Sequence, residues 1–112
     1  MKMYSMVMLR RGPAWSPTKT PESTKLFEGH MANIKAMART GKLVIAGPFD
    51  ADDSDASAYA GVFIFDVTDA AELKALLGND PAIAAGRLVP EVLAWYGPAG
   101  LTYDGRDEAL KE

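Results

Sequence analysis

The chain has 112 residues, of which 48% are hydrophobic and 24% charged, the balance of one ordinary globular domain. Its 12 basic and 15 acidic side chains give a net charge of −3 without a basic cluster, so we expect no nucleic-acid partner. The absence of cysteine excludes disulfides, thiolate metal sites and cysteine nucleophiles.

No apolar segment approaches the roughly 20 residues of a membrane span. The N-terminal stretch also lacks the long apolar region and the cleavage site of a secretory signal. We therefore expect a soluble, cytoplasmic protein with no membrane partner. A single domain is expected over residues 1–112, in which about 98–112 form a tail with too few apolar residues for a core element.

The first predicted strand is an apolar run, residues 3–10, which ends at a Gly-Pro turn. A proline-rich loop then leads to a helix start. Thr20 can cap this helix, and Pro21 suits its first position because an N–H there would have no helical partner. The helix is expected over residues 21–40, where apolar residues recur at three- and four-residue spacing.

Two further strands are predicted at residues 42–49 and 59–67, the second of them rich in β-branched and aromatic residues. The acidic stretch "DADDSD" between them lacks the glycine and the glutamate that a calcium loop needs at its sixth and twelfth positions, so we interpret it as a solvated loop. A second helix follows, capped by Thr68 or Asp69, with its leucines facing inward.

A short helical turn and a fourth strand complete the predicted elements. Asp80 precedes a proline and can cap the turn "PAIAAG". The fourth strand is expected over residues 87–97. Pro90 lies inside it and cannot donate a hydrogen bond to a neighbouring strand, which predicts an edge position or a bulge.

The order β-α-β-β-α-β predicts an α+β fold of the ferredoxin-like type, with a four-stranded antiparallel sheet. The predicted strands carry apolar residues on both faces, although two helices can cover only one face. A second copy of the same sheet is the simplest cover for the other face. We therefore predict a homodimer that associates through the sheet face.

Six segments also match a known family in order along nearly the whole chain: "LRRGPAW", "GHMANI", "GKLVIAGPF", "GVFIFDV", "NDPAIAAGRL" and "AWYGPAG". The chain resembles the YciI-like (YCII-related) proteins of the dimeric α+β barrel superfamily. The resemblance implies that His30 in "GHM" and Asp80 in "NDP" face a small ligand in a cleft near the helix–sheet junction. It also implies chemistry on a small cyclic or phenolic substrate, of the isomerase, dehydrochlorinase or hydrolase kind.

Read from the residues alone, His30 and Asp80 each have several interpretations. His30 is the only histidine and lies on an apolar helix face, so it could be a core residue, an acid–base group or, as in some barrel relatives, a haem ligand. Asp80 could act only as a helix cap, or it could also orient His30 with its second oxygen. No carboxylates cluster around the histidine in the sequence, so we expect no metal and no cofactor.

Aromatic and polar residues near the strand ends are candidates for binding the substrate. Arg10 could neutralise an anionic group or could be an exposed charge at the end of a strand. Trp15 could form a wall of the cleft or could pack across a dimer interface. The full set of predicted substrate-binding residues is Arg10, Trp15, Phe49, Tyr4, Ser5 and Trp95.

Two classes of function fit these observations. The first is a small-molecule enzyme in which His30 is the general acid or base and Asp80 orients it. The second is a non-catalytic module that binds a metabolite or has a regulatory role, with His30 donating a single hydrogen bond. The sequence leaves the choice between them open.

Overall fold

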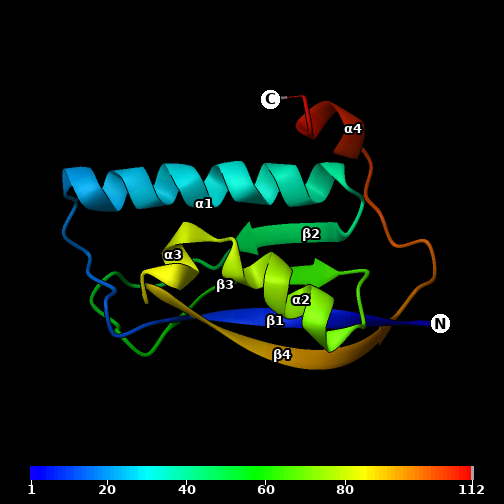
Figure 1. Ribbon diagram of the computed structural model, residues 1–112, viewed down its shortest axis with the longest axis horizontal. Helices are drawn as coiled ribbons and strands as arrows, with labels where there is room; N and C mark the ends of the chain where they lie inside the picture. The colour runs from blue at the N-terminus through cyan, green and yellow to red at the C-terminus, as the bar shows by residue number, and fades with distance from the viewer. Residues whose placement is uncertain (112) are drawn as a thin grey trace.

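The computed structural model describes residues 1–111, which form one antiparallel sheet with its helices (Figure 1). The sheet has the strand order β2-β3-β1-β4. The elements in chain order are β1 (Lys2–Arg11), α1 (Pro21–Arg39), β2 (Leu43–Pro48), β3 (Tyr59–Phe65), α2 (Ala70–Gly78), α3 (Pro81–Ala84), β4 (Leu88–Gly97) and α4 (Arg106–Ala109). The predicted β-α-β-β-α-β order and the α+β fold class are confirmed.

Local signals begin the helices where the sequence places them. The Thr20 hydroxyl accepts a hydrogen bond from the Ser23 N–H, and the Ser23 hydroxyl accepts one from the Thr20 N–H. Pro21 follows at the first helical position. Of the two possible caps for α2, the structure uses Asp69, whose carboxylate accepts from the Glu72 N–H.

One face of the sheet packs against the helices and forms the hydrophobic core. Val7 and Leu9 of β1 are buried there, together with Phe63 and Phe65 of β3. The remaining buried members of this core are Met37, Leu43, Val67, Leu73 and Leu77. The helices thus contribute one methionine and two leucines, and the strands contribute most of the rest.

The opposite face of the sheet, called here the open face, is also apolar. Side chains alternate along a strand, so the residues between the core residues of β1 point to this side. With their partners on β3 and β4, the apolar residues of the open face include Met6, Met8, Val62, Ile64, Leu93 and Trp95. Leu93 is 51% exposed, and none of the helices described lies on this face.

The strand that contains Pro90 is at the edge of the sheet, as predicted. β4 pairs only with β1, and Pro90 lies opposite Leu9 in that pairing. An edge strand has one side without a neighbouring strand, so the missing proline N–H breaks no ladder there.

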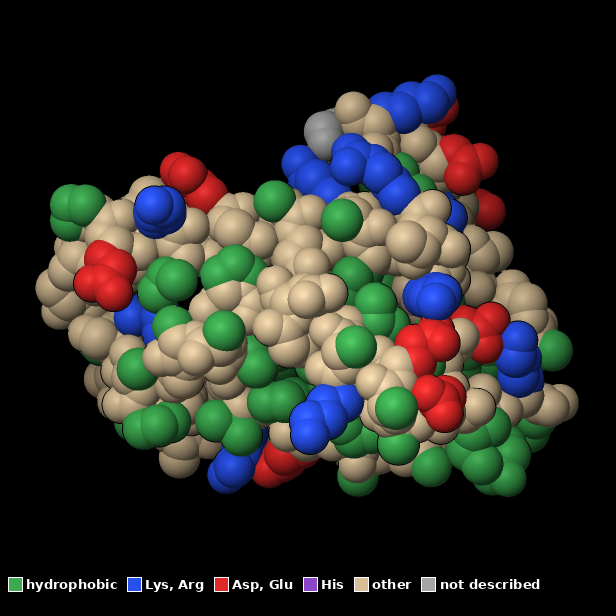
Figure 2. All heavy atoms as spheres, viewed as in Figure 1, with side chains coloured by type: hydrophobic (Ala, Val, Ile, Leu, Met, Phe, Trp, Pro, Cys, Tyr) green, Lys and Arg blue, Asp and Glu red, His purple; other side chains and the backbone are tan. Residues whose placement is uncertain are grey.

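The C-terminal segment folds back along the domain and ends in α4, which the sequence pattern did not predict. Arg106 donates to the Ala38 carbonyl at the end of α1, and Arg39 donates to the Leu110 carbonyl. No residue of α4 is buried, and charged side chains gather over α4 and the adjoining end of α1 (Figure 2). Residue 112 of the predicted tail lies outside the described residues.

Within residues 1–111, no helix combines the length and the hydropathy needed to cross a bilayer. The cytoplasmic location inferred from the sequence stays a prediction.

Candidate functional site

The predicted pair of polar residues is in direct contact. His30 Nδ1 lies 2.5 Å from Asp80 Oδ2, although 50 residues separate them along the chain. The Asp80 side chain is fully buried, and the His30 side chain is 13% exposed. A buried carboxylate is costly unless each oxygen has a partner, so the contact explains how Asp80 is tolerated in the interior.

The two carboxylate oxygens of Asp80 contact different partners. While Oδ2 faces His30, Oδ1 accepts hydrogen bonds from the backbone N–H groups of Ala82 at 2.8 Å and Ile83 at 3.3 Å. These are the unpaired donors at the start of α3, so Asp80 is its N-cap. The cap holds the carboxylate in place, and the position of α3 therefore sets the orientation of His30.

Gly29 allows α1 and α3 to approach closely enough for this contact. A Cβ atom at position 29 would lie only 2.8 Å from Cγ of Pro81, closer than real Cβ contacts allow. Pro81 is the first residue of α3 and follows Asp80 directly. The absence of a side chain on Gly29 thus brings the next residue of α1, His30, within reach of the carboxylate.

The His30 ring is oriented by its neighbours so that one nitrogen remains for a ligand. The ring stacks near Phe63, with 6.2 Å between centroids and an interplanar angle of 29°. In the tautomer that donates from Nδ1 to the Asp80 carboxylate, the lone pair lies on Nε2. Nε2 makes no hydrogen bond within residues 1–111, and the residue lines a cavity. Such an imidazole can accept a proton and hold the resulting charge next to a carboxylate.

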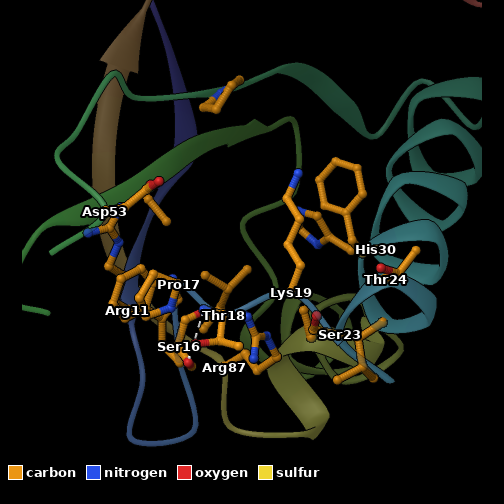
Figure 3. Close-up of a pocket in the computed structure, with 17 residues that line it drawn as sticks. Arg11, Ser16, Pro17, Thr18, Lys19, Ser23, Thr24, His30, Asp53 and Arg87 are labelled. Atoms are coloured by element: carbon orange, nitrogen blue, oxygen red, sulfur yellow. Dashed lines mark hydrogen bonds and ion pairs between the residues drawn. The ribbon is translucent and has the colours of Figure 1, made fainter. Parts of the chain in front are cut away.

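The cavity has a volume of about 580 Å³, which suits a small organic ligand (Figure 3). It lies between the end of β1, the loop after it, the N-terminal half of α1 and the start of β4. The residues that line it are Arg11, Trp15, Ser16, Pro17, Thr18, Lys19, Ser23, Thr24, Leu26, Phe27, His30, Pro48, Asp53, Ala60, Ala82, Arg87 and Leu88. Three of them are basic and only Asp53 is acidic, so the cavity is positively charged in a chain with net charge −3.

Two arginines hold the loops around the cavity. The Arg11 guanidinium stacks on Trp15 at 4.1 Å, and its Nη1 donates to the backbone carbonyls of Asp52 and Asp55 in the acidic loop. Arg87 donates to the carbonyls of Ala14 and Ser16, which flank Trp15 in the loop after β1. Arg11, the last residue of β1, thus holds the acidic loop, and Arg87, next to the start of β4, holds the Trp15 loop.

Two carboxylates of the acidic loop accept hydrogen bonds from residues of the same loop. The Asp52 carboxylate accepts from the N–H and hydroxyl of Ser54, and the Asp55 carboxylate accepts from the same groups of Ser57. These bonds favour the charged form and hold the pKa of each carboxyl below its ordinary value. Within residues 1–111, no group of three or more His, Asp or Glu side chains is arranged to hold a metal ion.

Of the six predicted substrate-binding residues, only Trp15 lines the cavity with His30. Arg10 points to the open face of the sheet, where its Nε lies 2.6 Å from Glu91. Its neighbour Arg11 shares the face of Val7 and Leu9 and reaches the cavity instead. Strand alternation could have identified Arg11, but both faces of β1 are apolar, so the pattern did not distinguish them.

The other four predicted residues lie away from the cavity for separate reasons. Tyr4 is 2% exposed, and its hydroxyl donates to the Pro98 carbonyl at 2.6 Å. The Trp95 ring packs against Tyr4 with 5.8 Å between centroids. Ser5 donates to the Val67 carbonyl at 2.6 Å, and Phe49 is 42% exposed. Arg87 and Lys19, which do line the cavity, were not among the predicted residues, although Arg87 lies in the matched segment "NDPAIAAGRL".

Residues 3–95 match the YCII-related domain family. The chain belongs to this family. No curated protein sequence matches the chain. The solved structures similar to this YCII-related domain include 5-chloro-2-hydroxyhydroquinone dehydrochlorinase (TftG) from Burkholderia phenoliruptrix AC1100, in complex with 2,5-dihydroxybenzoquinone. That similarity has a TM-score of 0.59 and 17% sequence identity, and it covers 84% of this chain and 95% of the other. At this identity the similarity concerns the fold.

Proposed function

We propose that this YCII-related domain is an enzyme that transfers a proton on a small ring compound bound in the cavity. His30 is the general base and acid, and Asp80 is its positioning residue. The observation that carries the proposal is the contact between His30 Nδ1 and the fully buried Asp80 carboxylate. Because that contact occupies Nδ1, it leaves Nε2 for the substrate.

The reaction begins with removal of a proton from a ring C–H or phenolic O–H by Nε2 of His30. The electron pair of that bond enters the ring, and the imidazolium is stabilised by the Asp80 carboxylate. In a dehydrochlorination, His30 then delivers this proton to the chlorine-bearing ring carbon, a second ring hydroxyl loses its proton, and the electron pair of that O–H bond expels chloride, so the sum is loss of one proton and one chloride. In an isomerisation, His30 returns the proton to another atom of the ring. The name of the TftG structure, a dehydrochlorinase acting on a hydroxylated ring, supports this class of reaction.

The proposal is tested by His30→Gln, which keeps a hydrogen-bonding side chain but cannot exchange protons. The assays are chloride release from 5-chloro-2-hydroxyhydroquinone and exchange of the ring protons of 2,5-dihydroxybenzoquinone for deuterium, followed by NMR. We expect a loss of about 10²–10⁴-fold in whichever rate the wild type accelerates. A folded His30→Gln protein with the wild-type rate would contradict the proposal. If the wild type binds these rings and accelerates neither process, the non-catalytic binding module is the better description.

We also propose that the open face of the sheet is covered by a second copy of the chain. Its apolar side chains, of which Leu93 is 51% exposed, together with an Arg10–Glu91–Tyr59 cluster at one end, support an isologous interface.

Leu93 and Val92 provide a matched test of this dimer, since they are 51% and 52% exposed and point to opposite faces of β4. We expect Leu93→Glu to give monomers and Val92→Glu to leave the dimer intact in sedimentation equilibrium. Equal effects of the two substitutions, or a monomeric wild type, would contradict this interface.

A further inference from the structure

We propose that Arg11 binds a carboxylate of the ring substrate through the Nε–Nη2 edge of its guanidinium, at the end of the cavity away from His30. This inference rests on the proposed function, because it names the substrate class of the same site. The substrate would then be a small ring acid, with its carboxylate at Arg11 and its reacting proton at His30. The inference depends on which donors of Arg11 are used and which are free.

The hydrogen bonds of Arg11 are confined to one of its guanidinium nitrogens. Nη1 donates to the carbonyls of both Asp52 and Asp55. Nε is buried and has no acceptor within residues 1–111, and Nη2 has no hydrogen-bond acceptor there either. Nε and Nη2 together form the edge of a guanidinium that donates two parallel hydrogen bonds to one carboxylate. Arg11 thus leaves unused the edge that recognises a planar two-oxygen anion.

The Arg11 side chain is held in place before any ligand arrives. It is 7% exposed, it stacks on Trp15 at 4.1 Å, and two carbonyls fix Nη1. A fixed guanidinium loses little freedom when it binds an anion, so more of the interaction contributes to affinity. A buried donor without an acceptor is also unfavourable by itself, and a ligand carboxylate at that edge would remove this cost.

The charge of the cavity favours the same class of ligand. Its lining includes Arg11, Lys19 and Arg87 against the single acid Asp53. Lys19 makes no ion pair among residues 1–111, and Figure 3 shows Arg11 and Asp53 on one side of the cavity with His30 on the opposite side. An anionic group attracted to the Arg11 side would place the rest of a small ring toward the histidine.

Asp53 is the group that such a ligand would replace. Its Oδ1 lies 3.9 Å from Arg11 Nη2, too far for a hydrogen bond, and its side chain is 87% exposed. An exposed and distant ion pair contributes little. A carboxylate that enters the cavity can therefore take the Nη2 donor without breaking a strong contact.

The test uses sodium benzoate as the probe and benzamide as its neutral counterpart. Binding is followed by NMR through the indole N–H of Trp15, with the indole N–H of Trp95 outside the cavity as an internal control. We expect saturable shifts of Trp15 with benzoate and at least about tenfold weaker binding of benzamide. Benzoate binding is measured without turnover, so anion binding is recorded separately from the proton-transfer rates that test His30.

Two pairs of variants decide the role of Arg11. We expect Arg11→Lys, which keeps the charge and removes the flat edge, to weaken benzoate binding about tenfold, whereas Arg10→Lys should leave it unchanged. Asp53→Asn should tighten binding about two- to fivefold, and more than Asp50→Asn, which removes the same charge from the same loop outside the cavity lining. A gain of affinity cannot come from a damaged fold, so it keeps the test valid if Arg11→Lys disturbs the loop.

Four results would each overturn the inference. They are the absence of a saturable benzoate shift in the wild type, equal affinity for benzamide, wild-type affinity in a folded Arg11→Lys protein, and no difference between Asp53→Asn and Asp50→Asn.

Discussion

At one end of the cavity the carboxylate of Asp80 is fully buried and lies 2.5 Å from the His30 ring, whereas at the other end Asp53 is 87% exposed and lies 3.9 Å from Arg11. Asp80 also caps α3, so both of its oxygens have partners. Among residues 1–111, the only ionic partner of the Asp53 carboxylate is the distant Arg11. The first contact cannot be exchanged without leaving a buried charge, and the second can be exchanged for a ligand.

The difference is consistent with the separate roles proposed above for the two ends of the cavity. A catalytic pair needs constant geometry, and burial between α1 and α3 provides it. The proposed binding group needs unused donors, and Arg11 has two, Nε and Nη2, because its hydrogen bonds within residues 1–111 are confined to Nη1. The following predictions test this contrast, from the largest expected effect to the smallest.

The largest effect is expected from Asp80→Asn. The amide oxygen can still cap α3, but the group no longer carries the charge that stabilises the imidazolium. We expect kcat to fall by about 10²–10⁴-fold with little change in stability. Asp69→Asn is the control, because Asp69 caps α2 in the same way and has no histidine partner. Equal rates in the two variants would show that Asp80 only caps its helix.

Gly29→Ala should disturb the catalytic end through packing alone. Its Cβ would lie 2.8 Å from Cγ of Pro81, so the Pro81 ring or the two helices must shift. We expect the free energy of unfolding in urea to fall by about 1–3 kcal/mol and the catalytic rate to fall with it. Gly78→Ala is the control, since nothing lies within 4 Å of a Cβ there and alanine favours the helix. A stable and fully active Gly29→Ala protein would show that the site does not need the close approach of α1 and α3 at Gly29.

Arg11→Ala should loosen the other end of the cavity without affecting the catalytic pair. It removes the two hydrogen bonds to the carbonyls of Asp52 and Asp55. We expect faster amide hydrogen exchange in residues 53–58, equivalent to about 1–2 kcal/mol of lost local stability, and an unchanged His30–Asp80 contact. Arg10→Ala, which removes only an exposed ion pair with Glu91, should leave this exchange unchanged. Equal exchange in the two variants would show that Arg11 does not hold the loop.

The smallest effect concerns pH and the acidic loop. Hydrogen bonds from Ser54 and Ser57 lower the pKa of Asp52 and Asp55 from the ordinary value of 3.8. A lowered pKa means that the ordered loop prefers the ionised carboxylates. Their contribution is therefore complete above the ordinary pKa and is lost as the pH falls through the lowered values. We expect the Ser54 and Ser57 amide signals to move only below about pH 4, and Ser57→Ala to return the pKa of Asp55 toward its ordinary value.

Much of the fold was predictable because its signals are local. The Thr20-Pro21 start of α1 and the edge position of the strand with Pro90 follow from the hydrogen-bonding capacity of single residues. α4 was not predictable because it is held by Arg106 and Arg39 donating to distant carbonyls rather than by an apolar face. Asp69 and Thr68 were equivalent as caps until the backbone geometry selected Asp69.

The sequence by itself determined the order of the elements and the family resemblance, and through that resemblance it singled out His30 and Asp80, the pair proposed here to be catalytic. Only the tertiary structure decided that these two residues touch, because a contact across 50 residues depends on how closely α1 and α3 pack. It also decided that Arg11 rather than Arg10 enters the cavity. Both faces of β1 are apolar, so only the packing of the helices shows which face lies inside.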